Sequence, residues 1–256
     1  MIYYYLFVMF IFGLCMGSFF LVVGTRLSEE KSIIKPNSHC THCKKILKSR
    51  DLIPVFSYLL NRGKCRYCHT KIGAIYPIVE IMTGILFVIT YIFFPAYSLN
   101  LMIGLILASL VIIISVSDFK YLIIPDEVLI VSATLIVIFR LIFSGFNSTL
   151  PYMLSGILAF VIMLLIKLIG DRVFKQESMG GADIKLLGVV GLALGLLPSL
   201  FVIFLGSFFA LPIAIIILVK RKEHILPYGP FLAIATWILW LYMPQFGRLV
   251  DYLFMI

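Results

Sequence analysis

The sequence predicts an all-α polytopic membrane protein, and three observations lead to that class. Of the 256 residues, 62% are hydrophobic and only 13% are charged, whereas soluble domains have about half apolar and about a quarter charged residues. The mean hydropathy is +1.12, so lipid must cover part of the surface. The apolar stretches are long and continuous, which excludes the short alternating segments of a transmembrane β-barrel. The same composition excludes a disordered chain and a small disulfide-stabilised secreted domain.

Stretches without charged residues predict about eight transmembrane helices, because each crossing needs about 20 residues. Three of these stretches are long enough for two helices each, and Gly, Pro, Asn and Ser residues that favour turns divide them. The first predicted span is residues 1–25 and the last is about 229–244. Between them lie three pairs of spans: 81–117 divides at 94–98, 128–166 divides at 144–148, and 186–219 divides at 195–199.

Basic residues are distributed unevenly between the two sides of this eight-helix arrangement. The segment 26–71 and the later loops on the same side hold all of the Lys and Arg residues except Arg140 and Arg248. The positive-inside rule places that side in the cytoplasm and both termini outside, so we expect a multi-pass protein of the bacterial cytoplasmic membrane. The net charge of +9 then indicates contact with membrane lipids that have anionic headgroups, and no nucleic-acid partner is expected.

A polar segment, residues 26–74, separates the first span from the membrane domain predicted for 75–256. It contains two C-x2-C pairs, a spacing that predicts one tetrahedral structural zinc site in a small zinc-ribbon-like insertion. Two disulfides are the alternative, which the cytoplasm disfavours, and three flanking histidines are alternative ligands. A zinc ion with four thiolate ligands has no open coordination position, so the site is expected to stabilise the segment rather than to catalyse. The predicted ligands are Cys40, Cys43, Cys65 and Cys68.

Two carboxylates lie at the predicted cytoplasmic ends of different membrane helices. Asp118 closes the third span and Asp183 opens the sixth. Each either caps its helix and pairs with a nearby lysine, or the two meet and share a proton. If they meet, the ionised carboxylate can take a proton from water while the protonated one polarises a carbonyl. Gly180 and Gly181 would let a peptide backbone approach closely.

Three further polar residues are candidates to support such a site. Asp126 follows a proline and fits an N-cap of the fourth span. Glu80 lies a few residues into the second span, where a carboxylate serves either a functional site or the packing of the bundle. Lys185 lies two positions after Asp183 and is a possible partner for it.

Five motifs occur in order along nearly the whole chain. They are Gly17-Ser18-Phe19 with Arg26-Leu27, Arg62–Cys68 with Tyr76–Glu80, Asp118 with Ile124-Pro125-Asp126, Met179–Lys185, and Pro227–Phe231. Together these motifs resemble those of the type IV prepilin peptidases, which are membrane aspartyl proteases of the GxGD class. The resemblance implies that Asp118 and Asp183 are the catalytic pair. One departure is Ala182, where the family usually has glycine; a methyl group there forbids only strained backbone conformations, so activity is expected to survive.

The resemblance also implies a function. Enzymes of this family remove the short basic leader from prepilins or pseudopilins of type IV pilus, type II secretion and competence systems, at a Gly-Phe-type junction on the cytoplasmic face. Many members also methylate the new N-terminus with S-adenosylmethionine, and their cysteine-bearing domain is associated with that activity. The expected partners are therefore prepilin substrates, and the implied cofactors are structural zinc and S-adenosylmethionine.

Two other functions use the same residues. A proton- or cation-coupled transporter would use Asp118 and Asp183 as relay carboxylates. The two halves of the sequence show no inverted repeat, however, and the two aspartates lie at one face rather than at the midplane. A zinc-bearing scaffold without catalytic activity would recruit a partner through the basic segment, and its aspartates would be exchangeable without loss of function.

Overall fold

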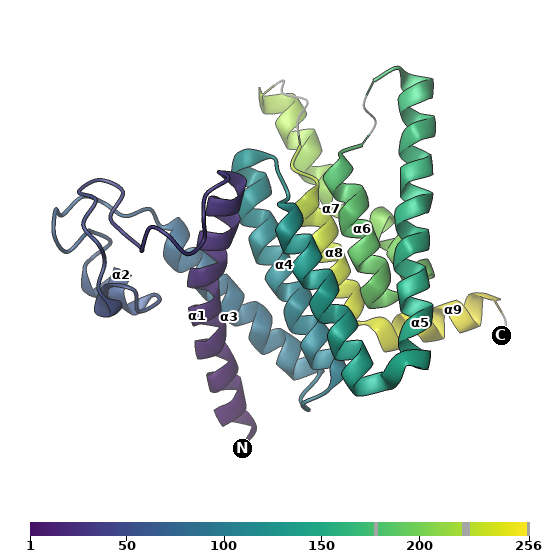
Figure 1. The fold of residues 1–256 in the computed structure, drawn as a ribbon, viewed down its shortest axis with the longest axis horizontal. Coiled ribbons are helices and arrows are strands. Elements are labelled where there is room, and N and C mark those ends of the chain that lie inside the picture. The colour runs from purple at the N-terminus through teal and green to yellow at the C-terminus, as the bar shows by residue number, and fades with distance from the viewer. Residues whose placement is uncertain (177–178, 222–225, 255–256) are drawn as a thin grey trace. The chain divides into compact units, whose positions relative to one another are not determined.

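The structure is a computed structural model that describes residues 1–176, 179–221 and 226–254 (Figure 1). Within these residues every named element is a helix, and the only strand-like pairings are two isolated β-bridges in the cysteine-rich segment. The predicted all-α class is therefore confirmed. The chain forms two compact units, Met1–Pro95 and Ala96–Ile256.

The first unit is built on a pair of apolar helices, α1 (Ile2–Ser28) and α3 (Ile75–Phe93). Glycines let the two backbones touch: a Cβ atom on Gly13 would lie 2.6 Å from the Cα of Gly84. Gly17, one turn further along α1, is equally close to α3. Small residues four positions apart are typical of closely packed membrane helices, because they let van der Waals contact extend to the backbone.

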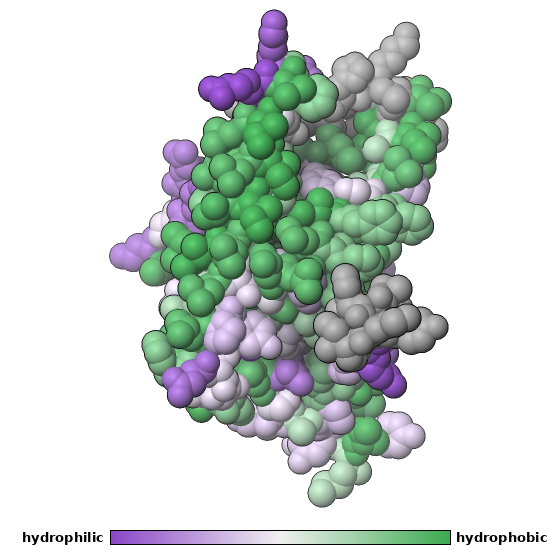
Figure 2. All heavy atoms as spheres, turned by 90° about the vertical axis from the view of Figure 1, so that its right-hand side faces the viewer, coloured by the Kyte–Doolittle hydropathy of each residue, from purple (hydrophilic) through white to green (hydrophobic). Residues whose placement is uncertain are grey.

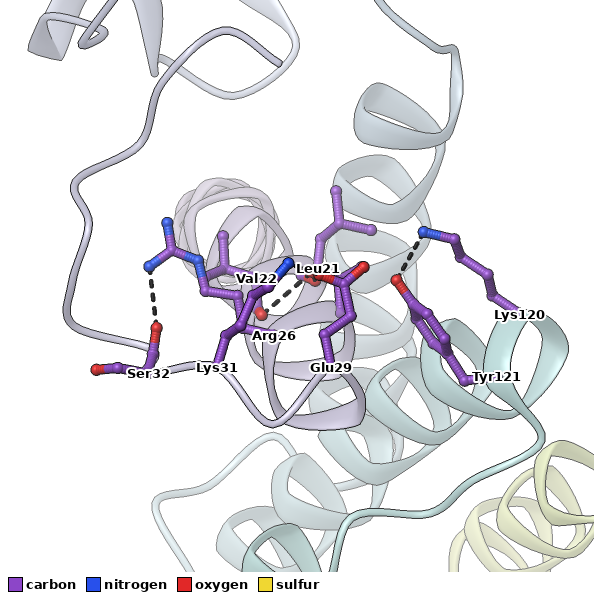
Figure 3. Close-up of polar contacts among 9 residues, drawn as sticks. Leu21, Val22, Arg26, Glu29, Lys31, Ser32, Lys120 and Tyr121 are labelled. Carbon is purple, nitrogen blue, oxygen red and sulfur yellow. Dashed lines mark hydrogen bonds and ion pairs between the residues drawn. The ribbon is translucent and has the colours of Figure 1, made fainter. Parts of the chain in front are cut away.

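The cysteine-rich insertion connects α1 to α3 and has little regular structure. It contains a 3-10 turn, η1 (Ser49–Asp51), and one short helix, α2 (Phe56–Leu60). Figure 3 shows how the chain leaves α1: the Arg26 guanidinium donates to the carbonyl oxygen of Ser32 at 3.2 Å. This hydrogen bond holds the chain against the C-terminal end of α1 where it enters the insertion.

The second unit is a bundle of six helices within the described residues. Its core is shared by most of these helices, and Ile103, Ile136 and Leu232 are among its completely buried side chains. The elements are α4 (Leu99–Tyr121), α5 (Asp126–Phe174), α6 (Gly181–Leu194), α7 (Leu196–Arg221), α8 (Gly229–Leu241) and α9 (Met243–Phe254).

Glycines with positive φ divide two of the long apolar stretches where the sequence predicts turns. Gly145 has φ 76° and ψ 173° and breaks α5 into two halves. Gly195 has φ 91° and ends α6 immediately before α7 begins. A residue without a Cβ atom adopts these conformations at little cost, so both predicted divisions are confirmed.

The helices are suited to a membrane. Within the described residues, α1, α3, α4, α5 and the stretch Leu196–Ile217 of α7 are long and apolar enough to cross one, and α8 is a shorter apolar helix. Figure 2 shows a broad band of hydrophobic side chains on the face where α5 lies, with hydrophilic side chains above and below it. The chain is therefore an integral membrane protein.

Candidate active site and metal centre

Asp118 lies in the last turn of α4 and is almost completely buried, with 6% of its surface exposed. Leu122, in the left-handed conformation with φ 56°, ends the helix by donating its N–H to the Asp118 carbonyl. The Asp118 side chain points to the start of α8, where the Gly229 N–H donates to Oδ2 at 3.1 Å. A helix N-terminus carries partial positive charge and unpaired N–H groups, so this end of α8 stabilises negative charge on Asp118.

Asp183 lies in the first turn of α6 and is half-buried. It is close enough to Asp118 for the charges of the two carboxyl groups to interact. Gly180, the N-cap of α6, approaches it closely, since a Cβ atom there would lie 3.2 Å from Asp183 Oδ2, whereas a Cβ atom on Gly181 would meet nothing within 4 Å. Ala182 adopts an ordinary helical conformation, so its methyl group introduces no backbone strain.

The lysine near Asp183 has a different partner. Lys185 Nζ lies 2.8 and 2.6 Å from the two carboxylate oxygens of Asp126 and ties the start of α6 to the start of α5. The expectation that Asp126 is an N-cap is wrong: Pro125 holds that position and Asp126 is the first residue of α5. Proline fits there because its fixed φ and missing N–H cost nothing before the first helical turn. Asp126 is thereby left to pair with Lys185.

The lysine near Asp118 contacts its own neighbour. Figure 3 shows the Lys120 ammonium donating to the hydroxyl of Tyr121 at 2.6 Å, and it also lies over that ring. Both residues belong to the last turns of α4, next to Asp118 in sequence. This contact occupies one donor of the Lys120 ammonium at the end of the helix.

Tyr228 and Gly229 are two residues of this site that the sequence analysis included in a motif but gave no role. The Tyr228 hydroxyl donates to the Ile203 carbonyl at 3.1 Å, shares a hydrogen bond with Ser207, and lies within range of the charge of Asp183. A Cβ atom on Gly229 would lie 3.0 Å from Asp118 Oδ2. Their only sequence signal was their place at the entry to the last helix.

Glu80 lies in the first unit, whereas the two aspartates lie in the second. It is buried, with 6% of its surface exposed, and its Oε2 accepts the Val55 N–H at 2.7 Å. The Ser18 side chain on α1 lies close to the same carboxylate. Glu80 therefore joins the cysteine-rich insertion to both membrane helices of the first unit.

The four predicted cysteine ligands come together in the insertion. Their sulfur atoms all lie within 4.8 Å of one another, and the sulfurs of Cys40 and Cys68 are 3.8 Å apart. All five cysteines of the chain are described, and each is a free thiol, so the disulfide alternative is not adopted. A metal with four sulfur ligands at about 2.3 Å has tetrahedral edges of about 3.8 Å. The donor set therefore fits a tetrahedral metal ion such as zinc.

The two cysteine pairs share one local geometry. In each pair the first cysteine donates its N–H across a tight turn, Cys40 to the Lys45 carbonyl at 3.0 Å and Cys65 to the Thr70 carbonyl at 2.9 Å. The residue after the second cysteine is left-handed in both pairs, with φ 59° at Lys44 and 57° at His69. Each turn thus points two thiols toward the same place, as metal-binding knuckles do. The Thr70 hydroxyl and amide lower the pKa of the nearby Cys68 thiol to about 5, whereas burial and the neighbouring thiols raise the pKa of Cys43 to about 11. Cys68 is therefore more ready than Cys43 to bind a metal as a thiolate.

Asp51 supports the second knuckle and was not singled out from the sequence. It accepts the Tyr67 hydroxyl at 2.9 Å and the Lys48 N–H at 3.1 Å, and its Oδ1 lies 3.3 Å from the Arg66 guanidinium. Burial opposes ionisation of Asp51, but these hydrogen bonds and Arg66 outweigh burial and keep the pKa of the carboxyl below its usual value. Arg66 and Tyr67 lie between Cys65 and Cys68, so Asp51 holds the turn that carries these two thiols.

The fold and the site define a class: an integral membrane protein with two neighbouring aspartates at helix ends and a four-cysteine insertion. Residues 105–215 match the type IV leader peptidase family, and residues 11–94 match the bacterial peptidase A24 N-terminal domain. The chain belongs to the type IV leader peptidase family.

Several curated proteins are similar over most of the chain. A prepilin leader peptidase/N-methyltransferase of Bacillus subtilis (strain 168) is 33% identical over 241 residues, which cover 92% of this chain and 93% of that protein. A protein of the same name from Neisseria gonorrhoeae is 30% identical, over 88% of this chain and 78% of its own length. A type 4 prepilin-like proteins leader peptide-processing enzyme of Escherichia coli O78:H11 is 30% identical, over 80% of this chain and 75% of its own length. No solved structure matches the chain.

Proposed function

We propose that this chain is a membrane aspartyl endopeptidase that removes the short basic leader from type IV prepilins or pseudopilins at a Gly-Phe-type junction. The observation that supports this most strongly is that Asp118 and Asp183 lie at the ends of α4 and α6 with their charges within range of each other, in a chain of the leader peptidase family. Several relatives are named for prepilin leader cleavage, which supports the same substrate class here.

The two carboxyl groups divide the work of hydrolysis. Two carboxyls at close range share one proton, since like charges repel. The Gly229 N–H stabilises negative charge on Asp118, so Asp118 suits the base that takes a proton from water. The water oxygen then bonds to the scissile carbonyl carbon while the protonated Asp183 donates to the carbonyl oxygen. The C–N bond then breaks as the leaving nitrogen takes the proton from Asp118, and a hydroxyl group of the tetrahedral intermediate returns its proton to Asp183 as the new carbonyl forms. The pair again holds one proton, which restores the starting state.

The cytoplasmic face is the side on which we propose that cleavage occurs. Nearly all basic residues lie on the side that carries the segment 26–71 and the ends of the helices bearing Asp118 and Asp183. Under the positive-inside rule that side is the cytoplasm. A basic leader also stays in the cytoplasm while the following hydrophobic helix enters the bilayer, which brings the scissile bond to the same interface.

The test is cleavage of a prepilin with a Gly-Phe junction by purified protein in lipid, read as a gel shift. Asp118→Asn and Asp183→Asn should each abolish cleavage, because asparagine neither shares the proton nor accepts one from water. Asp171→Asn is the matched control, because Asp171 pairs with Lys167 on α5. The Asp171→Asn variant should cleave prepilin like the wild type. Cleavage by both Asp118→Asn and Asp183→Asn at the wild-type rate would exclude an aspartyl mechanism.

The metal centre and a second activity complete the proposal. We infer that the four-cysteine site binds zinc, which would cross-link the two knuckles of a segment too small to form its own hydrophobic core. The names of the relatives include N-methyltransferase, which supports transfer of a methyl group from S-adenosylmethionine to the new N-terminal amine. In that step an N–C bond forms, the S–CH3 bond breaks, and the amine loses a proton. Radiolabelled methyl donor tests it by incorporation of label into cleaved pilin.

A further inference from the structure

Arg140 is a buried basic residue for which the proposed reaction has no role. It lies in the first half of α5, and only 5% of its surface is exposed. A charged side chain inside a membrane bundle is costly unless it has partners. Its partners therefore indicate why it is there.

The partners are main-chain carbonyls at the end of α6. Arg140 Nε donates to the Leu192 carbonyl at 3.0 Å, and Nη2 donates to the Ala193 carbonyl. The last four carbonyls of any helix lack donors within the helix, and in α6 the Gly191 carbonyl is satisfied by the N–H of Gly195. The Arg140 guanidinium thus satisfies the next two.

The need for these donors follows from the length of α6. Its 14 residues span about 21 Å, whereas the hydrocarbon core of a bilayer is about 30 Å thick. A helix of this length that begins at one interface ends within the hydrocarbon, where neither water nor lipid can donate to a carbonyl. The planar fork of a guanidinium can supply two N–H groups at once, which an ammonium cannot do in the same geometry.

Arg140 also connects the two halves of α5. Its guanidinium carbon lies 3.4 Å from the centre of the Tyr152 ring, and Tyr152 follows the break at Gly145. Tyr152 lies next to the end of α6, since a Cβ atom on Gly195 would be 3.8 Å from its ring. Both halves of α5 therefore meet the C-terminal end of α6 at Arg140.

Other contacts between α5 and α6 hold the position of α6 along the membrane normal less firmly than Arg140 does. The Lys185–Asp126 ion pair is about half exposed at both ends, and exposed ion pairs contribute little. Gly156 and Gly191 pack backbone against backbone, with a Cβ atom on Gly191 only 2.8 Å from the Cα of Gly156. The Leu192 side chain also fills the space beside Gly156. These apolar contacts are non-directional, so they oppose sliding of one helix along the other less specifically than hydrogen bonds do. The two directional bonds from Arg140 resist it.

We propose that Arg140 is a positioning residue for Asp183: by holding the C-terminal carbonyls of α6, it fixes the depth of that helix and so the place of Asp183 beside Asp118. The inference rests on the proposed function. Asp183 and Ala193 are ten residues apart on one short helix, so a shift at one end moves the other. A misplacement of about 1 Å at a catalytic group can lower a rate by about a hundredfold.

The test compares Arg140→Lys with the wild type. Lysine keeps the charge but loses the fork, so we expect kcat to fall by about tenfold or more with KM within about twofold, since the substrate contacts remain. Arg248→Lys is the matched control, because Arg248 is exposed on α9 and should behave as the wild type. If Arg140→Lys does not fold, Tyr152→Leu, which removes the ring and keeps Arg140, should lower kcat by about threefold.

A second measurement does not depend on activity. Amide hydrogen exchange of the protein in lipid nanodiscs reports on α6 directly, and we expect Arg140→Lys to increase exchange at residues 183–187 as well as at 192–195. An increase confined to 192–195, or a wild-type kcat for Arg140→Lys, overturns the inference. If the wild type cleaves no prepilin, the proposed function fails, and exchange at 183–187 still decides whether Arg140 positions Asp183.

Discussion

Replacing Gly229 with alanine tests whether the start of α8 must touch Asp118. A Cβ atom at Gly229 would lie 2.8 Å from Ile124 Cδ1, 3.0 Å from Asp118 Oδ2 and 3.0 Å from Ile114 Cγ2. The Ile124 Cδ1 atom is the flexible end of its side chain and can move aside, whereas the Ile114 methyl group sits on the branched Cβ of a completely buried residue and has little room to move. The Asp118 carboxylate has to retreat by a few tenths of an ångström, which lengthens its hydrogen bond from the Gly229 N–H, now 3.1 Å.

Two opposite effects determine the outcome. Alanine is favoured over glycine in helices by up to about 1 kcal/mol, but the crowded Cβ atom costs about 1–3 kcal/mol, so the unfolding temperature should stay level or fall modestly. A hydrogen bond to a charged group contributes about 1.5–3 kcal/mol. Because about 1.4 kcal/mol is a factor of ten in rate, loss of most of this bond should lower kcat by about tenfold to a hundredfold. The variant should therefore fold and cleave slowly.

Prepilin cleavage and thermal unfolding, measured on the same preparation in lipid, check this expectation. Gly247→Ala is the matched control, because a Cβ atom at Gly247 would meet nothing within 4 Å, and it should match the wild type in both measurements. A Gly229→Ala variant with wild-type kcat would refute the view that the Gly229 N–H stabilises Asp118 during the reaction.

Three further predictions concern the first unit. The purified protein should contain one zinc ion per chain, lost in Cys40→Ser and in Cys68→Ser; elemental analysis that finds no zinc, with disulfides formed, would contradict the metal site. Asp51→Asn should weaken zinc binding by about tenfold in competition with a chelator. Because the folded pKa of Asp51 lies below its usual value, its carboxylate stays charged above pH about 4, so the advantage of wild type over Asp51→Asn should be the same at every pH at which the thiolates hold zinc. Glu80→Ala should expose the segment around α2 to limited proteolysis, because the Val55 N–H loses its partner; Glu30→Ala, at an exposed position, is the control, and equal cleavage rates would count against this role of Glu80.

Features that depend on the type and spacing of particular residues could be predicted from the sequence. The four cysteines converge as their C-x2-C spacing predicts, and the helix breaks at Gly145 and Gly195 fall where turn residues divide apolar stretches. In both cases the residue type itself carries the information, since thiols bind metals and glycine tolerates positive φ.

Contacts between side chains and a distant backbone could not be predicted. Arg140 was expected as a charge on the outer side of the membrane, but it is buried and donates to carbonyls of α6. Asp118 and Glu80 likewise accept N–H groups of Gly229 and Val55. A backbone N–H or carbonyl is the same at every residue, so no sequence pattern marks the partner, and only the fold brings the two together.

The glycine contacts between α1 and α3 bear on how the family can diversify. Because Gly13 and Gly17 hold α1 against α3, both ends of the cysteine-rich insertion leave from one helix pair that packs without it. The entropy cost of closing a loop grows only with the logarithm of its length. A short linker in place of residues 30–73 would therefore keep the same helix pairing, provided that it supplies a donor to Glu80 in place of the Val55 N–H. The insertion is a module that evolution or an engineer can exchange, while the membrane helices keep their architecture.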